Sequence, residues 1–212
     1  MFASNYARYY ELFNQDKPYK EEIGFVYLWA DKPKSILDVG CGTAHYWKHY
    51  PKEVVLTGVD VSRSMACQSK NIICTDVSKF TSRKVYETAT ALFDVINYIP
   101  RHEWWNKIPV KRGGYWIFDL WDKEKVMRDG FQTTVKKVDD AVRKISPVKV
   151  GGFYESVDLK VEVTHGETHF SEIHKMYLYS REDIEKFCGD DFEIADERAT
   201  KTWQSWWKLK KI

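Results

Sequence analysis

The sequence of 212 residues has little excess charge of either sign and no long apolar run. Its formal net charge of +2 provides no basic field that would capture nucleic acid by counterion release. No stretch approaches the roughly 18 to 20 apolar residues that a membrane span needs, and the polar N-terminal segment MFASNYARYYELFNQDK lacks the apolar core of a signal peptide. We therefore expect a cytoplasmic protein without nucleic-acid or membrane partners.

Cysteine is also scarce, and we expect reduced thiols. There is neither C-x-x-C spacing nor the density of a secreted disulfide scaffold among Cys41, Cys67, Cys74 and Cys188. His165 and His169 share a predicted hairpin, but two further ligands are missing, so no metal site is predicted. Internal repeats and long Pro, Gly or Ser linkers are absent from the sequence, which favours a single domain over residues 1–212.

Short apolar runs alternate with helix signatures in the first half of the chain. Runs typical of strands buried on both faces occupy residues 35–39, 54–59, 71–75, 89–96 and 115–120. Helical patterns lie at residues 62–69 and 101–107, and Ile23 and Val26 mark one face of an earlier helix that Pro33 closes. This alternation predicts an α/β fold with a parallel sheet.

The spacing of apolar residues is different in the second half of the chain. Apolar and polar residues alternate, as in an antiparallel meander with one solvated face, in residues 133–145, 153–164 and 169–179. Ser180 is then a helix N-cap, followed by acidic residues in the first turn of a helix that runs to about Cys188. Two final strands, near residues 192–195 and 202–208, are expected to complete the main sheet.

The motif ILDVGCGTAHYW predicts a binding site for a nucleoside cofactor. It consists of a buried strand that ends in Asp38, followed by Gly40 and Gly42 and then a short helix. Glycines let the backbone approach a ligand closely, and the amides of a helix N-terminus favour electronegative groups. Asp60 ends the next strand, about twenty residues later, where a carboxylate can accept hydrogen bonds from both ribose hydroxyls. The alternative is a tight turn in which Asp60 only caps the following helix.

Two common nucleotide cofactors fit this motif poorly. A nicotinamide fingerprint requires a third glycine where this chain has His45, and an apolar residue where it has Asp38. The P-loop pattern G-x-x-x-x-G-K-[ST] does not occur in the sequence. NAD is therefore disfavoured and a P-loop nucleotide site is excluded.

Several segments together resemble the successive motifs of class I S-adenosylmethionine-dependent methyltransferases. They are ILDVGCGT, GVDVSRSM, the Asp76 of NIICTDVSKF, and ALFDVINYI followed by RGGYWIFDLW. The segments YARYYELFNQDKPY and EIHKMYLYSREDIEKF are similar to the small-molecule branch that includes nucleotide-sugar amino N-methyltransferases. The resemblance implies a Rossmann-like, mostly parallel sheet of seven strands with an antiparallel β insertion before the last helix. It divides the domain into a leader and first helix (1–34), a cofactor-binding core (35–130), the insertion (131–179), and the last helix with terminal strands (180–212).

S-adenosylmethionine is the cofactor that the resemblance implies, with S-adenosylhomocysteine as the product. The resemblance implies that Asp38 and the loop after it bind the methionine end of the cofactor, and that Asp60 binds the ribose. Asp76 and the Val77 amide would bind the adenine. Gln15 matches a leader position that folds over the cofactor. Cys41 lies within the loop as a small side chain without a redox role. The full set of implied cofactor-binding residues is Tyr10, Tyr19, Asp38, Gly40, Cys41, Gly42, Asp60, Val61, Asp76, Val77, Leu92 and Phe93.

The acceptor side has five candidate residues. Four of them lie near the carboxyl edge of the predicted sheet, where ligands bind in this architecture, and His174 lies on the predicted meander. We expect Tyr10, Tyr98, His102 and His174 to be catalytic, and Tyr98, Trp121 and His174 to bind the substrate. In the sugar enzymes a histidine often follows the fourth strand, whereas this chain has Tyr98 there. Structural alternatives stay open: leader packing for Tyr10, a solvated helix start for His102, a core plug for Trp121, and an outward strand position for His174.

Methyl transfer from a sulfonium needs mainly an oriented acceptor and a dry site. The predicted activity is in-line transfer to an amine or hydroxyl of a small polar acceptor, and a nucleotide-linked sugar is the predicted acceptor. The alternatives are an RNA or protein methyltransferase and an inactive, cofactor-binding protein.

The leader and the insertion hold much of the aromatic share of 16%, and we expect part of it to line a lid. The insertion also offers a surface for a homodimer, or a cover for the acceptor site.

Overall fold

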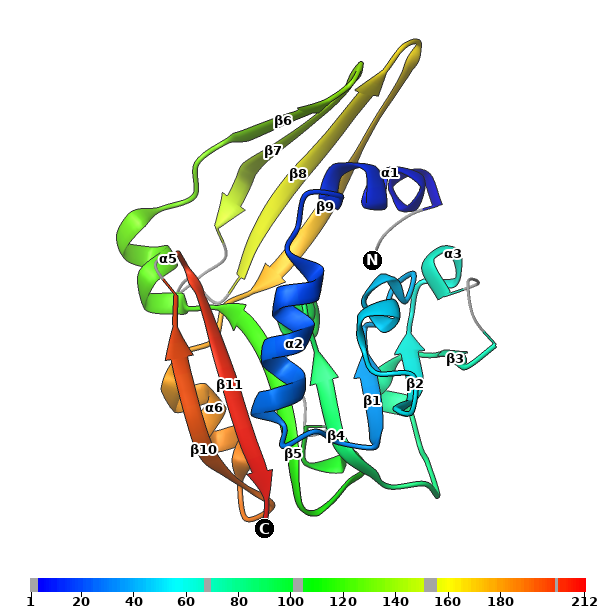
Figure 1. Ribbon diagram of the computed structural model, residues 1–212. Helices are drawn as coiled ribbons and strands as arrows, with labels where there is room; N and C mark the ends of the chain where they lie inside the picture. Colours follow the sequence, from blue (N-terminus) through cyan, green and yellow to red (C-terminus); the bar gives the residue numbers. More distant parts are fainter. Residues whose placement is uncertain (1–3, 67–69, 101–104, 151–155, 201) are drawn as a thin grey trace.

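The computed structural model describes residues 4–66, 70–100, 105–150, 156–200 and 202–212. Figure 1 shows a larger sheet in the lower half of the molecule and a smaller, elongated sheet above it. The larger sheet has seven strands in the order β10-β11-β5-β4-β1-β2-β3. β11 is antiparallel to both of its neighbours, and the other pairings are parallel. The predicted α/β fold with a seven-stranded, mostly parallel sheet is confirmed.

Very short helices connect most strands of the larger sheet. Its strands are β1 (Ser35–Val39), β2 (Val55–Asp60), β3 (Ile72–Cys74), β4 (Tyr86–Ala91), β5 (Val110–Trp121), β10 (Phe192–Ala199) and β11 (Gln204–Lys211). The intervening helices are η1 (His45–His49), α3 (Arg63–Ala66), η2 (Val77–Lys79), α4 (Val95–Tyr98), η3 (Trp105–Lys107), α5 (Lys123–Asp129) and α6 (Arg181–Cys188). None of the helices in the described part of the chain is long and apolar enough to cross a membrane.

Longer helices cover the sheet faces. Helix α2 (Tyr19–Trp29) lies over one face, where Ile23 and Val26 are fully buried against a core that includes Ile36 and Ile117 of the sheet. Helix α6 covers the opposite face. The predicted N-cap at Ser180 is present there and is part of a capping box, because its hydroxyl accepts from the Asp183 amide while the Asp183 carboxylate accepts from the Ser180 amide.

The smaller sheet is antiparallel and precedes α6, as predicted. It consists of β6 (Thr134–Val138), β7 (Ala141–Val150), β8 (Ser156–His165) and β9 (Thr168–Tyr177), paired in that order. Alternate residues of β8 are buried, so one face of the sheet is apolar. Helix α1 (Ser4–Asn14) packs on that face through Tyr6 and Phe13, which form a separate small core with Val161 and Val163.

The fourth strand ends earlier than predicted. The apolar run 89–96 was expected to be a single strand, but β4 ends at Ala91 and Val95 begins α4. Phe93 and Asp94 between them have positive φ angles of 70° and 56°. The prediction was wrong because the strand and the helix are both largely buried, so apolar character alone cannot separate them.

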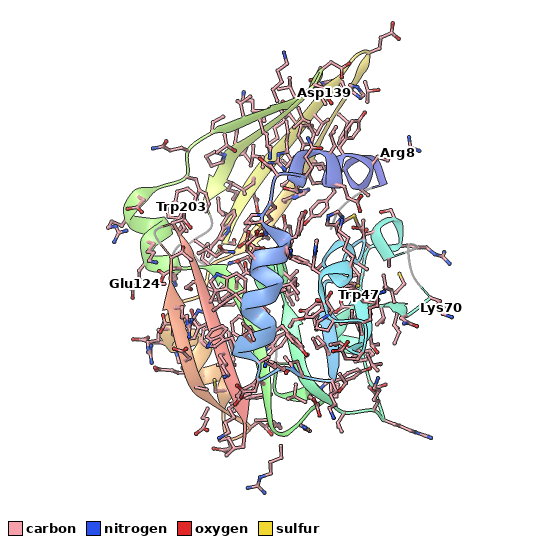
Figure 2. The ribbon with its side chains drawn as sticks, in the orientation of Figure 1. Arg8, Trp47, Lys70, Glu124, Asp139 and Trp203 are labelled. Carbon is pink, nitrogen blue, oxygen red and sulfur yellow. The ribbon has the colours of Figure 1, made fainter. Side chains whose placement is uncertain are left out.

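The first strand predicted for the meander is two strands. Residues 133–145 were expected to be continuous, but the chain reverses at Asp139 and Asp140 between β6 and β7. Asp139 has a φ of 52° and lies at the outer tip of the sheet (Figure 2). Aspartate tolerates this left-handed conformation better than most residues, so the reversal needs no glycine, and the usual hairpin signal is missing.

Other element boundaries also differ from the predictions. The helix predicted at 62–69 is the single turn α3 over its described residues, and the 101–107 helix is described only from Trp105, as the 3₁₀ turn η3. The predicted final strands at 192–195 and 202–208 both exist, and β10 and β11 extend to Ala199 and Lys211.

Candidate active site

Two adjoining cavities lie where the carboxyl ends of β1, β2, β4 and β5 face the antiparallel sheet. Their volumes are about 300 and 280 Å³. Gly40, Asp60, Val95 and Tyr98 line both, so the cavities meet at these four residues. The larger cavity continues toward α1 and the inner face of the antiparallel sheet, and the smaller one lies over β2 and η2.

The glycine loop forms part of the wall at this junction. Gly40 and Gly42 have φ angles of 65° and 54°, which glycine adopts without strain. The Gly40 amide donates to the Val59 carbonyl at 2.7 Å, and the Gly42 amide donates to Asp60 Oδ2 at 2.8 Å. A Cβ atom on Gly40 would lie 2.4 Å from Cγ1 of Val95. The loop therefore depends on glycine both for its conformation and for its packing against α4.

Asp38 is the acid before the first glycine and is only 5% exposed. Its Oδ2 accepts from the Trp47 indole at 2.7 Å, and its Oδ1 accepts from the Thr90 hydroxyl at 3.1 Å. Trp47 lies beside β1 and β2 (Figure 2). Burial raises the pKa of Asp38 to about 6, since the two hydrogen bonds offset desolvation only in part and Asp60 adds like charge. Asp38 thus joins β1 to η1 and β4 and places a carboxyl group next to the larger cavity.

Asp60 lies at the carboxyl end of β2 between the two cavities. Its oxygens accept one hydrogen bond each, from the amides of Gly42 and of Ser62, at 2.8 and 2.7 Å. Burial raises the pKa of Asp60, and these amide donors counteract the shift. Each carboxylate oxygen can accept a second hydrogen bond, so the pair can receive two neighbouring hydroxyls from a ligand.

The smaller cavity is lined by the residues predicted to hold the adenine. These are Asp76 and Val77, and Val61, Ile99 and Pro100 also lie on its wall. Asp76 Oδ1 accepts from both the amide and the hydroxyl of Ser78 at 2.8 Å, which fixes the carboxylate at the start of η2. The result is a largely apolar slot with an acid at its rim, a suitable shape for a flat heterocycle with an amino group.

The turn after β4 is held by a fully buried carboxylate. Asp119 on β5 accepts from the amides of Phe93 and Asp94 at 2.8 and 3.0 Å, and from the Gln204 side chain. Asp94 itself lines the larger cavity, and its buried Oδ1 has no hydrogen-bond partner in the described structure. Burial, with Asp119 adjacent, raises the pKa of Asp94 well above its usual range. This orphaned acceptor is suited to a cationic donor on a ligand.

Three further aromatic side chains and one cation line the larger cavity. Trp121, Phe131 and Trp203 form a contiguous group with ring centroids 5.2–6.3 Å apart, and Trp203 lies at the junction of α5 and β11 (Figure 2). Arg143 of β7 is the one Arg or Lys among the described residues that line this cavity. It donates to the Tyr6 hydroxyl at 3.0 Å and forms no ion pair within the described part of the chain.

Nearly all the predicted site residues lie on these two cavities. Those that line the larger one are Tyr10, Tyr19, Asp38, Gly40, Cys41, Gly42, Asp60, Leu92, Phe93, Tyr98, Trp121 and His174. His102 lies outside the described residues. Gln15 does not line either cavity, whereas its neighbour Asn14 does. The leader aromatics divide as expected: Tyr6, Tyr10 and Tyr19 line the cavity, and Phe13 is fully buried in the core beneath α1.

Several important residues were not predicted. Asp94 belongs to the left-handed turn after β4, and Asp119 holds that turn, which has no sequence signature. Arg143 lies on β7, and the chain reversal that begins this strand was not predicted. Glu172 could have been found, because residues two apart in a strand share a face and His174 was already a candidate. Asn97 is fully buried and joins three elements, since it donates to the Tyr177 carbonyl at 2.6 Å and accepts from the Trp121 amide at 2.9 Å.

The arrangement favours binding and orientation over nucleophilic catalysis. Burial raises the pKa of the Cys41 thiol, so this cysteine is not a thiolate at neutral pH. Asp38, Asp60 and Asp94 are the acids that line the larger cavity, and Arg143 is its one Arg or Lys among the described residues. Such a site suits one ligand with a nucleoside and a cationic end, and a second ligand that enters beside α1.

No protein-family model matches the sequence, and no curated protein matches it significantly. Solved structures do match along almost the whole chain. An S-adenosylmethionine-dependent methyltransferase from Clostridium acetobutylicum has a TM-score of 0.79 at 20% identity, with 96% of each chain covered.

Two of the matching structures are sugar-modifying enzymes by description. CalS10, an amino pentose methyltransferase from Micromonospora echinaspora with bound S-adenosylmethionine, has a TM-score of 0.75 at 14% identity, with 100% of this chain and 98% of its own covered. The sugar N-methyltransferase KedS8 from Streptoalloteichus has a TM-score of 0.73 at 19% identity, with 95% and 92% covered. This chain therefore has the fold of S-adenosylmethionine-dependent methyltransferases.

Proposed function

We propose that the protein is an S-adenosylmethionine-dependent methyltransferase that acts on a small polar acceptor. The observation that carries this proposal is the meeting of two cavities at Asp60 beside the glycine loop. A nucleoside with a charged amino-acid end needs this arrangement: a slot for the base, a paired acceptor for the ribose, and acidic groups beyond it. The matching methyltransferase structures support the same assignment.

The cofactor fits the residues that line the cavities. The adenine would lie in the smaller cavity at Asp76 and Val77, and the ribose hydroxyls would donate to Asp60. The ammonium group of the methionine end would donate to the orphaned Oδ1 of Asp94, near Gly40 and Leu92. The contact with Asp94 would give a partner to a buried acceptor that has none in the described structure.

The cofactor supplies an activated methyl group and its own leaving group. The protein then has to align the acceptor with that methyl group and to exclude water. The larger cavity is suited to both, since Tyr10 of α1, Tyr98 of α4 and apolar residues of the antiparallel sheet line it. Tyr10 and Tyr98 also provide hydroxyls near the acceptor.

The acceptor is best described as an amine or hydroxyl on a nucleotide-linked sugar. Arg143 provides a cation for a phosphate, and Trp121, Phe131 and Trp203 provide aromatic faces for a sugar ring or base. The two sugar-modifying enzymes with the same fold support this substrate class.

Replacing Arg143 by glutamine is expected to raise the KM for a nucleotide-linked amino sugar about tenfold and to leave kcat nearly unchanged. The lost interaction is a charge-assisted hydrogen bond to a group remote from the methyl transfer, worth about 1.5–3 kcal/mol. Steady-state kinetics would measure the change. The matched substrate control is the free amino sugar without phosphate, whose KM should not move; an equal rise for both sugars would contradict this role.

Calorimetry with S-adenosylmethionine tests the cofactor assignment. Binding near micromolar concentration is expected, and Asp60→Ala should weaken it at least tenfold because two hydrogen bonds to the ribose are lost. The matched control is Asp190→Ala, at an exposed position in the turn after α6. No binding by the wild-type protein, or equal binding by the Asp60 variant, would contradict the assignment.

The acceptor class is tested by production of S-adenosylhomocysteine. Nucleotide-linked amino sugars, neutral sugars, small amines and RNA would be compared as acceptors. Turnover with RNA alone would contradict a small-molecule acceptor. Cofactor binding without turnover on any acceptor would favour an inactive binding protein.

A further inference from the structure

Three side chains form a hydrogen-bonded chain that leads away from the larger cavity. The Tyr98 hydroxyl lies 3.2 Å from His174 Nδ1, and His174 Nε2 lies 3.3 Å from Glu172 Oε2. Tyr98 lines both cavities and His174 lines the larger one. The chain therefore begins where the two proposed ligands meet and ends on a carboxylate.

The alternation of side chains along β9 explains why His174 and Glu172 lie on the same face. Residues two apart on a strand point to the same face, so Glu172 and His174 both face α1, and Ile173 is 55% exposed on the other face. Tyr98 approaches from the opposite side on α4. Asn97 ties that helix to β9 and to the end of β5, so the Tyr98–His174 contact does not depend on a mobile loop.

Burial and hydrogen bonding together select one protonation pattern. The side chains of His174 and Glu172 are 3% and 11% exposed. Burial lowers the pKa of His174, and Glu172 opposes that shift, so the imidazole is neutral at pH 7. The carboxylate can only accept from Nε2–H, which leaves the lone pair on Nδ1 to accept the Tyr98 O–H. The second oxygen of Glu172 accepts from the Tyr6 amide at 3.3 Å.

Other polar and charged groups around the chain come from several elements. The Tyr6 ring packs edge-on against His174, with centroids 5.6 Å apart, and Tyr10 lies next to Tyr6 on α1. Asp94 precedes α4, and Arg143 reaches the Tyr6 hydroxyl from β7. The residues of β8 closest to His174, Leu159 and Val161, are apolar.

We propose that Tyr98, His174 and Glu172 form a proton relay that removes the proton from the acceptor nitrogen or oxygen during methyl transfer. Tyr98 is the catalytic residue of the relay, since it faces the acceptor. His174 receives its proton, and Glu172 is a positioning residue that fixes the imidazole tautomer and stabilises its charged form. This inference rests on the proposed methyltransferase function.

Every proton is accounted for in this step. The acceptor N–H or O–H proton passes to the Tyr98 oxygen as the Tyr98 proton passes to Nδ1 of His174. The acceptor lone pair forms the new bond to the methyl carbon, and the carbon–sulfur bond breaks with its electron pair left on sulfur. His174 becomes an imidazolium paired with Glu172 and later releases its proton to solvent. The three side chains have the roles of the hydroxyl, histidine and carboxylate in a catalytic triad.

A purely structural role makes different predictions. If the three side chains only join β9 to α4, their replacement would alter stability and cofactor affinity together, with no effect on the pH dependence of turnover. A relay predicts unchanged cofactor affinity and a pH profile that follows His174.

The first test compares Tyr98→Phe, His174→Asn and Glu172→Gln with wild type, using the nucleotide-linked amino sugar that turns over fastest in the acceptor assay. We expect Tyr98→Phe and His174→Asn to lower kcat about 100-fold, the lower end for general acid–base catalysis. Calorimetric affinity for S-adenosylmethionine should stay within about threefold. His169→Asn is the matched control, at an exposed position on the same strand, and should retain full kcat.

The second test is independent of the acceptor. Histidine-ring ¹⁵N NMR should show a neutral Nε2–H tautomer for His174 and a pKa below its ordinary 6.5. In Glu172→Gln that pKa should fall further because the opposing carboxylate is gone, and the acid limb of kcat should move to lower pH with it. An Nδ1–H tautomer, or wild-type kcat in Tyr98→Phe with cofactor binding intact, would overturn the relay. Failure of the wild-type protein to bind S-adenosylmethionine would overturn the proposed function, and the relay with it.

Discussion

Replacing Asp119 by alanine is expected to lower the free energy of unfolding by about 3–4 kcal/mol. Asp119 is fully buried and accepts hydrogen bonds from the amides of Phe93 and Asp94 and from Gln204. Each buried donor left without a partner costs about 1–3 kcal/mol. The two amides belong to consecutive residues with positive φ, so the conformation that they hold is unfavourable on its own. Urea denaturation followed by circular dichroism would measure the loss.

A nearby aspartate provides the control for this measurement. Asp122 caps α5 by accepting from the Lys125 amide at 3.0 Å, a contact whose loss typically costs about 1 kcal/mol. Asp122→Ala should therefore be clearly milder than Asp119→Ala. Equal losses in the two variants would show that the turn after β4 stands without its buried carboxylate.

The parts of the fold that local sequence determines were predictable. The strands at 35–39 and 54–59 are recognisable by their apolar composition, although β2 is buried only at Gly58 and Val59. Ser180 and the acidic residues after it mark the start of α6. The ends of β4 and β6 were not predictable, because both strands end in left-handed turns without glycine, at Phe93 and Asp94 and at Asp139. Such turns are stabilised by tertiary contacts that no local pattern reveals.

The candidate site divides in the same way. The glycine loop and Asp60 come from one short stretch of β-α-β sequence with a recognisable spacing, and both line the cavities of the structure. Arg143 and Glu172 belong to strands whose inward face depends on register, and register is set by pairing across the sheet. The acceptor end of the site is therefore the part that a single sequence describes least well.

Replacing Asp94 by asparagine is expected to weaken S-adenosylmethionine binding about 100-fold. The carboxylate is proposed to accept from the methionine ammonium, and a charge-assisted hydrogen bond in a buried site is worth about 1.5–3 kcal/mol. Asparagine tolerates the φ of 56° at this position, so the turn itself should be preserved. Calorimetry would measure the affinity, with Asp190→Ala as the unaffected control.

The same substitution should stabilise the protein in the absence of cofactor, increasingly so as pH rises. Burial raises the pKa of Asp94 in the folded state, so the folded protein holds a proton that the unfolded chain has lost. Stability from this group is therefore present at pH 4 and falls as pH rises through the folded pKa. Asparagine cannot ionise, so the Asp94→Asn variant should match wild type near pH 4 and exceed it at pH 8 in urea denaturation. Higher stability together with lower affinity in the variant would show that Asp94 is unfavourable in the free protein and is stabilised by a bound cation. A loss of both stability and affinity would mean that Asp94 only holds the turn.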